Sequence, residues 1–137
     1  MSYGATPTPE QQAAIESRMN SFAAAVAASD WDAALEEYTE DAVIMPPNTA
    51  PLVGRPAIRA WAEALPPITS FEWENHEIMM FGDVAVIRGT YRMTMTIPDA
   101  PEPVRDVGSY LEVRHQQADG RWLLARDVFN TDLPLPV

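Results

Sequence analysis

The stretch VAVIRGTYRMTMTI, residues 84–97, decides the fold of this chain. Apolar and polar side chains alternate along it with the period of two that is typical of a half-buried β-strand. Comparable stretches cover residues 69–80, 104–115 and 121–131. Gly82-Asp83 and Asp119-Gly120 lie between neighbouring stretches and have the composition of tight hairpin turns. The second half of the chain is therefore predicted to form four consecutive antiparallel strands.

The first half of the chain shows helical spacing instead. A helix is predicted over residues 9–28, because one apolar stripe recurs at Ile15, Met19, Phe22 and Val26. Thr8 and Gln11 have the spacing of a capping box at its start. Trp31, Leu35 and Tyr38 fit the buried side of a short second helix that ends near residue 39. A short strand is predicted over residues 42–45, and Gly54-Arg55-Pro56 opens a third helix.

The predicted fold class is α+β, with three N-terminal helices packed on one face of a curved antiparallel sheet. One strand lies between the second and third helices, and four strands follow. Long twisted strands that wrap around helices form a cone, which encloses a pocket. The length of 137 residues suits a single domain over residues 1–137, with flexible ends at 1–8 and 134–137.

Charge and composition exclude several classes of function. The chain has 20 acidic residues against 9 basic ones and a net charge of −11, which argues against nucleic acid and anionic membranes as partners. Cysteine and lysine are absent and only two histidines occur, so disulfides, lysine Schiff bases and three-histidine metal sites are excluded. No phosphate-binding loop or ligand cluster implies a cofactor or a metal. Without a long apolar run or a secretory signal, the expected location is the cytoplasm.

Two parts of the sequence carry a family resemblance. They are YTEDAVIMPP (38–47) with VGRPAI (53–58), and DGRW (119–122) with RDVFNTD (126–132). These segments resemble the NTF2-like superfamily and, within it, the SnoaL-like or ketosteroid-isomerase-like group of small bacterial proteins. The resemblance implies a conical α+β fold, a pocket between sheet and helices, and a homodimer formed through the sheet.

The resemblance also implies catalytic positions, and the sequence departs from some of them. Ketosteroid isomerases place a carboxylate base just after the first strand and an oxyanion-stabilising tyrosine on the first helix. This chain has Pro46 and Phe22 at those positions, so steroid isomerisation by that mechanism is not supported. Polyketide cyclases of the SnoaL group use a His/Asp pair late in the chain, which Asp127 and, more loosely, His115 match.

Asp127 is the first candidate for chemistry. Strand alternation places it on one face with Leu123, Ala125 and Phe129. A carboxyl on such an apolar face is predicted to have a raised pKa and to act as a general acid or base, whereas the alternative is a structural ion pair with an arginine. A two-residue turn at 119–120 would place Glu112 opposite Asp127, and one extra residue would place Leu111 there. The more apolar face favours Leu111, with Glu112 solvated.

The other candidate residues have more than one interpretation. His115 is either a proton shuttle or a surface histidine beside the last turn. Asn130 is either a partner of the acid or a group that closes the sheet by hydrogen bonds to the backbone. The candidates for contact with a substrate in the pocket are Phe22, Trp61, Tyr91, Met93, Ser109, Tyr110 and Phe129. Aromatic and methionine side chains suit a flat apolar ligand, although they also build ordinary cores.

These observations support two functions of different classes. The first is a cofactor-independent acid–base enzyme, of the isomerase, cyclase or lyase type, that acts on a small hydrophobic carbonyl or aromatic compound. The second is a non-catalytic dimer that binds a hydrophobic ligand or serves as an accessory module. An Asp127 without an arginine in reach favours the enzyme, whereas an Asp127–Arg pair favours the binding protein.

Overall fold

The computed structural model describes residues 4–134, and within this range three helices and six strands follow one another. The helices are α1 (Pro9–Ala27), α2 (Trp31–Leu35) and α3 (Arg55–Glu63). The strands are β1 (Tyr38–Met45), β2 (Leu52–Val53), β3 (Ile68–Phe81), β4 (Val84–Met95), β5 (Val104–Gln116) and β6 (Trp122–Phe129). The predicted α+β class and the run of four consecutive strands are confirmed.

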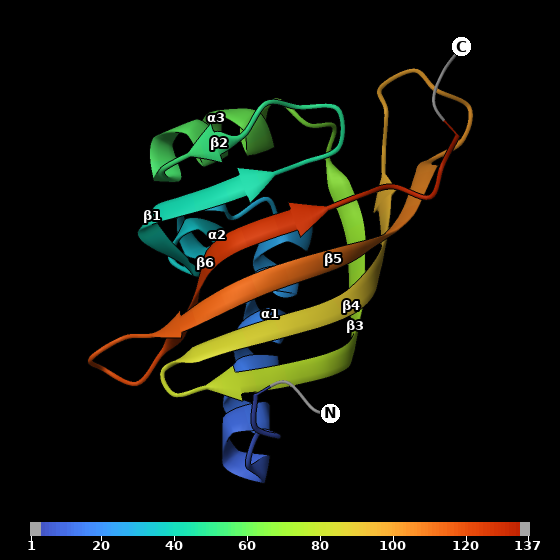
Figure 1. Cartoon of the computed structure of the whole chain (residues 1–137). Coiled ribbons are helices and arrows are strands. Elements are labelled where there is room, and N and C mark those ends of the chain that lie inside the picture. Colours follow the sequence, from blue (N-terminus) through green and yellow to red (C-terminus); the bar gives the residue numbers. More distant parts are fainter. Residues whose placement is uncertain (1–3, 135–137) are drawn as a thin grey trace.

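The described strands form one curved, unclosed sheet in the order β2-β1-β6-β5-β4-β3 (Figure 1). Neighbouring strands pair antiparallel except β1 and β6, which run parallel. The prediction of a wholly antiparallel, five-stranded sheet is therefore wrong in two respects. The parallel pair arises because α3 and the meander β3–β5 intervene before the chain returns beside β1. The two-residue strand β2 was missed because it is too short to show any periodicity.

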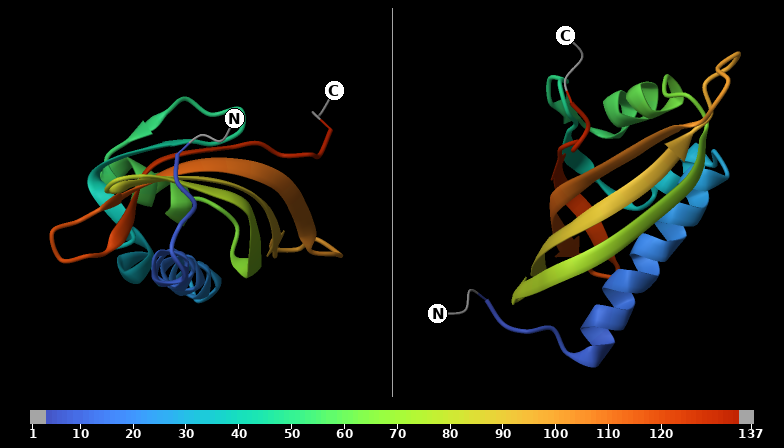
Figure 2. Two further views of the ribbon diagram at one scale, coloured as in Figure 1. Left: turned by 60° about the horizontal axis from the view of Figure 1, so that its bottom comes forward. Right: turned by 90° about the vertical axis from the view of Figure 1, so that its right-hand side faces the viewer.

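Helices cover the concave side of the sheet. Figure 2 shows the sheet curving around α1, which packs against β3. Ile15, Met19 and Val26 of the predicted stripe are buried, and this apolar contact holds α1 in place. The predicted capping box is present, since Thr8 Oγ1 accepts from the Gln11 backbone N–H at 3.1 Å and Gln11 Oε1 accepts from the Thr8 N–H at 2.9 Å. No helix of residues 4–134 is long and apolar enough to cross a membrane.

The second helix is shorter than predicted. It ends at Leu35, and Tyr38 begins β1 instead of continuing a helix. Tyr38 enters the sheet because it pairs with Leu124 of β6, and its carbonyl oxygen accepts a hydrogen bond from Arg55 Nε at 3.1 Å. This change of element directs the Tyr38 side chain into the interior, where the residue is only 5% exposed.

The chain ends predicted to be flexible fall partly outside the described residues, at 1–3 and 135–137. Within the described part, Ala5 pairs with Met80 of the edge strand β3. The backbone N–H of each residue donates to the carbonyl oxygen of the other at 2.8 Å. The segment before α1 therefore lies along the edge of the sheet.

Candidate active site

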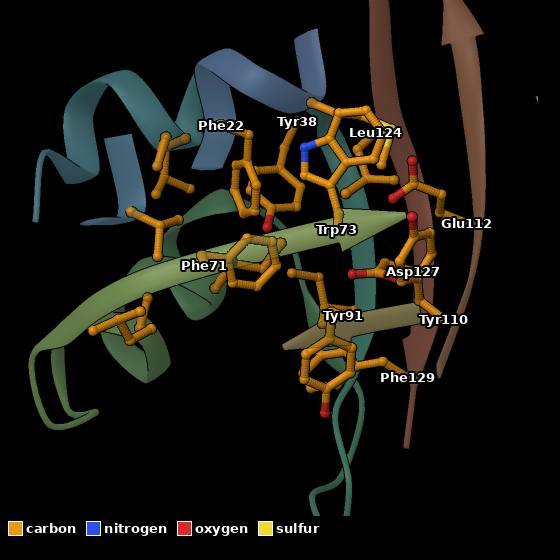
Figure 3. A pocket seen from close by; sticks show the side chains of 18 of the residues that line it. Phe22, Tyr38, Phe71, Trp73, Tyr91, Tyr110, Glu112, Leu124, Asp127 and Phe129 are labelled. Atoms are coloured by element: carbon orange, nitrogen blue, oxygen red, sulfur yellow. The ribbon is translucent and has the colours of Figure 1, made fainter. Parts of the chain in front are cut away.

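A cavity lies between the concave face of the sheet and the helices. Its volume is about 120 Å³, and its walls are mainly aromatic and aliphatic side chains from all three helices and from β1 and β3–β6. The charged residues among those that line it are Glu112, Arg114 and Asp127. Figure 3 shows Glu112 and Asp127 together on the wall formed by β5 and β6. The charges are therefore gathered on one side of an otherwise apolar chamber.

The β5–β6 hairpin has an irregular register. Gln116 pairs with Trp122, which leaves residues 117–121 in the turn. Farther from the turn, β6 contains a β-bulge at Ala125, where one extra residue interrupts the pairing with β5. The bulge moves the register by one residue and turns Asp127 toward the cavity.

This bulge corrects the predicted surroundings of Asp127. Glu112, not Leu111, lies opposite Asp127, and Glu112 is only 5% exposed rather than solvated. Leu111 is 45% exposed instead. Nearer the turn, Leu124 rather than Leu123 lines the cavity, because the bulge breaks the strict alternation along β6. The longer turn is present as predicted, but the bulge cancels its effect on the register.

Asp127 is a carboxyl group without a partner. Its Oδ1 atom is shielded from solvent and accepts no hydrogen bond from residues 4–134. None of the ion pairs within that range includes Asp127. Burial and, second, the neighbouring Glu112 carboxyl raise the pKa of Asp127 to about 8, against a smaller lowering effect of Arg114. At neutral pH this carboxyl is therefore mostly protonated.

The opposite carboxyl, Glu112, has a partner. Arg114 Nε donates to Glu112 Oε1 at 2.8 Å, and both side chains are buried. Arg114 Nη1 also donates to the carbonyl oxygen of Trp122 at 3.2 Å. Since residues two apart on a strand share a face, β5 presents both members of this ion pair to the cavity. The arginine charge is thus matched by Glu112, and Asp127 is left without a countercharge.

Three tyrosines face the cavity, and two of them have hydroxyl groups bound to other side chains. Tyr110 donates to Asn75 Oδ1 at 2.5 Å, and Tyr91 donates to Asp106 Oδ2 at 2.9 Å. The third, Tyr38, lines the cavity without a side-chain hydrogen bond to any residue of 4–134. Two hydroxyls are therefore structural, and one is available.

Two glycines allow the bound tyrosines to lie where they do. Tyr110 pairs across the sheet with Gly89, and Tyr91 pairs with Gly108. A Cβ atom at either glycine would collide with the tyrosine opposite it. The missing side chains let the two tyrosines approach the backbone of the neighbouring strand closely, which is a known use of glycine in sheets.

Most of the residues predicted to contact substrate line the cavity. They are Phe22, Trp61, Tyr91, Met93, Tyr110 and Phe129. The Phe129 ring lies edge-on to Tyr91 at 5.7 Å and packs against Trp61 at 6.3 Å, as measured between ring centroids. These contacts make part of the cavity wall continuous and aromatic. Contact of these residues with a ligand stays a prediction.

Three other predicted residues lie away from the cavity lining. The exposed Ser109 donates its backbone N–H to Asn130 Oδ1 at 3.0 Å. The Asn130 carbonyl oxygen lies 2.8 Å from the Tyr91 hydroxyl and shares its single hydrogen with Asp106, so Asn130 has the sheet-closing geometry. His115 Nε2 lies 3.0 Å from Asp83 Oδ2, at the exposed end of the hairpins. These positions give no support to catalytic roles for His115 and Asn130 or to substrate contact by Ser109, which stay predictions.

Two polar residues that line the cavity, Tyr38 and Arg114, were not among the predicted site residues. The spacing of Trp31, Leu35 and Tyr38 fits a helix, so it gives no reason to place Tyr38 on a strand that faces the cavity. Arg114 does have a signal, because strand alternation places it on the same face as Glu112. An arginine two residues from a glutamate on an inward-facing strand predicts a buried ion pair once the register is known.

The polar wall of the cavity can transfer protons and donate hydrogen bonds. It has one unpaired acid, one matched ion pair and one available hydroxyl. Among residues 4–134, no three histidine, aspartate or glutamate side chains come together to hold a metal ion.

Solved structures share this fold. A ketosteroid isomerase-like protein from Erwinia carotovora atroseptica superposes with a TM-score of 0.79 at 22% identity, covering 93% of this chain and 100% of that chain. An NTF2-like protein with a cystatin-like fold from Novosphingobium aromaticivorans has a TM-score of 0.70 at 17% identity, covering 90% and 82%. A candidate scytalone dehydratase from the same species has a TM-score of 0.75 at 17% identity, covering 89% and 84%. At these identities the similarity shows the fold alone.

Sequence comparison identifies the family. No protein of curated function matches the sequence. The SnoaL-like domain matches residues 19–125, which include the C-terminal part of α1 and all of β1–β5. The resemblance noted in the sequence is confirmed, and the chain belongs to the SnoaL-like domain family.

Proposed function

We propose that the protein is a cofactor-independent acid–base enzyme of the isomerase, cyclase or lyase type. Its substrate is a small hydrophobic carbonyl or aromatic compound held in the cavity. The observation that carries this proposal is the unpaired Asp127 carboxyl, which faces an apolar chamber and forms no ion pair with an arginine among the described residues. An acid kept only for stability would have a partner.

The pKa of about 8 suits Asp127 to proton transfer near neutral pH. In its ionised form the carboxylate removes a proton from the carbon next to the substrate carbonyl, which leaves an enolate. The Asp127 acid then returns that proton to another carbon in an isomerisation, or to a departing oxygen in a lyase reaction. The aromatic walls exclude water and hold the flat substrate against this group.

The proposal is tested by hydrogen–deuterium exchange at the methyl group of acetophenone in D₂O, followed by proton NMR. The wild type is expected to accelerate exchange, and Asp127→Asn is expected to reduce the enzymatic rate by about 100-fold or more. Asp106→Asn is the matched control, because Asp106 is a buried aspartate of the same sheet whose carboxyl is bound by the Tyr91 hydroxyl. Equal rates for wild type and Asp127→Asn would reject the acid–base function and leave a ligand-binding protein as the remaining interpretation.

We further propose that two copies associate through the convex face of the sheet. Met45, Val128 and Leu111 form an exposed apolar row across β1, β6 and β5, because Val128 pairs with both of the others. Exposed apolar rows of this kind mark association surfaces. Leu111→Arg is expected to convert a dimer to a monomer in sedimentation equilibrium, whereas a wild type that sediments as a monomer contradicts the proposal.

A further inference from the structure

We propose that Tyr38 is a second polar contact for the ligand, and that its hydroxyl and the Asp127 carboxyl together hold one oxygen atom. The ligand class that follows is a neutral molecule with a single hydrogen-bond-accepting oxygen, such as a ketone. This inference rests on the proposed function, since it concerns the same cavity. It adds a specificity-determining residue and a charge requirement that the proposed function does not contain.

The first argument is the contrast among the three cavity tyrosines. Tyr110 and Tyr91 each donate their hydroxyl hydrogen to a neighbouring side chain, so neither has a hydrogen left for a ligand. Tyr38 is only 5% exposed, yet its hydroxyl has no hydrogen-bond partner among residues 4–134. The hydroxyl is not among the fully shielded unbound atoms of residues 4–134, so it opens onto the cavity that Tyr38 lines. An unbound hydroxyl at such a cavity wall points to a partner that enters the cavity.

The second argument is the rigid placement of Tyr38. The Arg55 guanidinium fixes its backbone carbonyl, and the Phe22 ring packs edge-on against its ring with centroids 5.7 Å apart. Figure 3 shows the Tyr38 hydroxyl and the Asp127 carboxyl directed into the same chamber from different strands. Burial and the nearby Asp127 raise the pKa of Tyr38 well above its usual range. The hydroxyl therefore stays a hydrogen-bond donor throughout the range in which Asp127 titrates.

The third argument is the charge of the polar wall. The Arg114 guanidinium is already bound to Glu112, so no unmatched cation faces the cavity. An anionic ligand would meet the Glu112 and Asp127 carboxyls without a countercharge, which is costly in a buried site. A ketone oxygen instead accepts a hydrogen bond from Tyr38 and, in the protonated complex that predominates below about pH 8, a second one from Asp127. The proton transfer proposed above starts from the ionised minority of the same carboxyl. The wall therefore selects neutral acceptors and rejects carboxylates.

Three probes of similar shape separate these properties. Acetophenone has the acceptor oxygen, α-methylstyrene replaces that oxygen with a CH₂ group, and benzoate carries a negative charge. Binding to the full chain is measured by NMR titration at pH 6.5, where Asp127 is protonated. Carbon-13 in the acetophenone carbonyl adds a spectroscopic readout, because its resonance moves downfield as the oxygen accepts hydrogen bonds.

Tyr38→Phe is the decisive variant, and Tyr110→Phe and Tyr91→Phe are its matched controls. Tyr38→Phe is expected to weaken acetophenone binding by about 3- to 10-fold, to leave α-methylstyrene binding unchanged and to move the bound carbonyl resonance upfield. Its thermal stability stays that of the wild type, since it breaks no hydrogen bond of the described chain. The two controls lower stability, because each leaves a hydrogen-bond acceptor unbound. They keep the preference for acetophenone, because any ring contact that changes affects acetophenone and α-methylstyrene alike.

Several results would overturn the inference. They are an unchanged acetophenone preference in Tyr38→Phe, benzoate binding tighter than acetophenone, or no binding of acetophenone to the wild type. The outcome is separable from that of the proposed reaction. A lost preference in Tyr38→Phe without any exchange in the wild type supports the inference and rejects the reaction. An unchanged preference, together with exchange that depends on Asp127, does the reverse.

Discussion

Glu112 and Asp127 face one another across β5 and β6, and both line the same cavity. Arg114 is bound to Glu112 at 2.8 Å, and a second hydrogen bond of this guanidinium goes to the backbone of Trp122. Asp127 has no such partner, and its Oδ1 atom is shielded from solvent. Two carboxyls in one cavity therefore differ in the partner that the fold supplies.

This difference separates a structural carboxyl from a reactive one. In a buried ion pair each charge is neutralised by the other member, so removing one member leaves an uncompensated charge. A buried carboxyl without a partner becomes neutral near pH 7 and remains free to exchange its proton with a substrate. The absence of an ion-pair or hydrogen-bond partner among the described residues, more than depth of burial, thus identifies Asp127 as the candidate acid–base group.

The largest expected effect comes from breaking the Glu112 pair. Arg114→Met is predicted to lower the free energy of unfolding by about 3–5 kcal/mol, because Glu112 remains buried without its countercharge. Urea denaturation followed by tryptophan fluorescence measures this change. Arg88→Met is the control, since the Arg88–Glu77 pair is exposed and its loss should cost less than about 1 kcal/mol. Equal losses for both variants would mean that the Glu112 pair is not buried in solution.

The next effect tests the unpaired carboxyl through the pH dependence of stability. The pKa of Asp127 is about 8 in the folded chain and about 3.9 in an unfolded chain, so folded Asp127 keeps a proton that the unfolded chain releases between these values. Rising pH therefore favours unfolding. From pH 6 to pH 8, the wild type should lose about 2 kcal/mol of stability relative to Asp127→Asn.

Urea denaturation of both proteins at several pH values measures that difference. Glu37, whose pKa is also raised by burial, is present in both proteins and cancels in the comparison. Parallel stability curves for the two proteins would show that Asp127 is ionised in the fold, with a partner, and would remove the basis of its proposed role.

The comparison also shows which features can be predicted from sequence. Strand periodicity places β3–β6 to within a few residues, and the spacing of Thr8 and Gln11 predicts the start of α1, because these signals are local. The aromatic character of the cavity follows from the same periodicity. Family resemblance adds the fold, and its matched motif adds Asp127 as a candidate.

The remaining features depend on long-range pairing. No glycine marks the bulge at Ala125 in the sequence, yet this bulge determines that Glu112 rather than Leu111 lies opposite Asp127. The helical spacing that ends at Tyr38 is overruled because that residue pairs with β6, far away in sequence. The partners of both carboxyls are fixed by such pairings, so residue types alone do not distinguish the structural acid from the reactive one.

The smallest expected effect concerns Asp106, a third carboxyl that sharpens the comparison. Its two oxygens accept hydrogen bonds from the Tyr91 and Thr131 hydroxyls at 2.9 and 2.5 Å, so it resembles Glu112 in having partners. Asp106→Asn is predicted to lower stability by about 1 kcal/mol, since the amide retains one of the two acceptor oxygens. Thermal unfolding measures this loss. If the variant instead lost exchange activity as completely as Asp127→Asn, a carboxyl with hydrogen-bond partners would be acting as the acid. The presence or absence of a partner would then no longer distinguish a structural carboxyl from a reactive one.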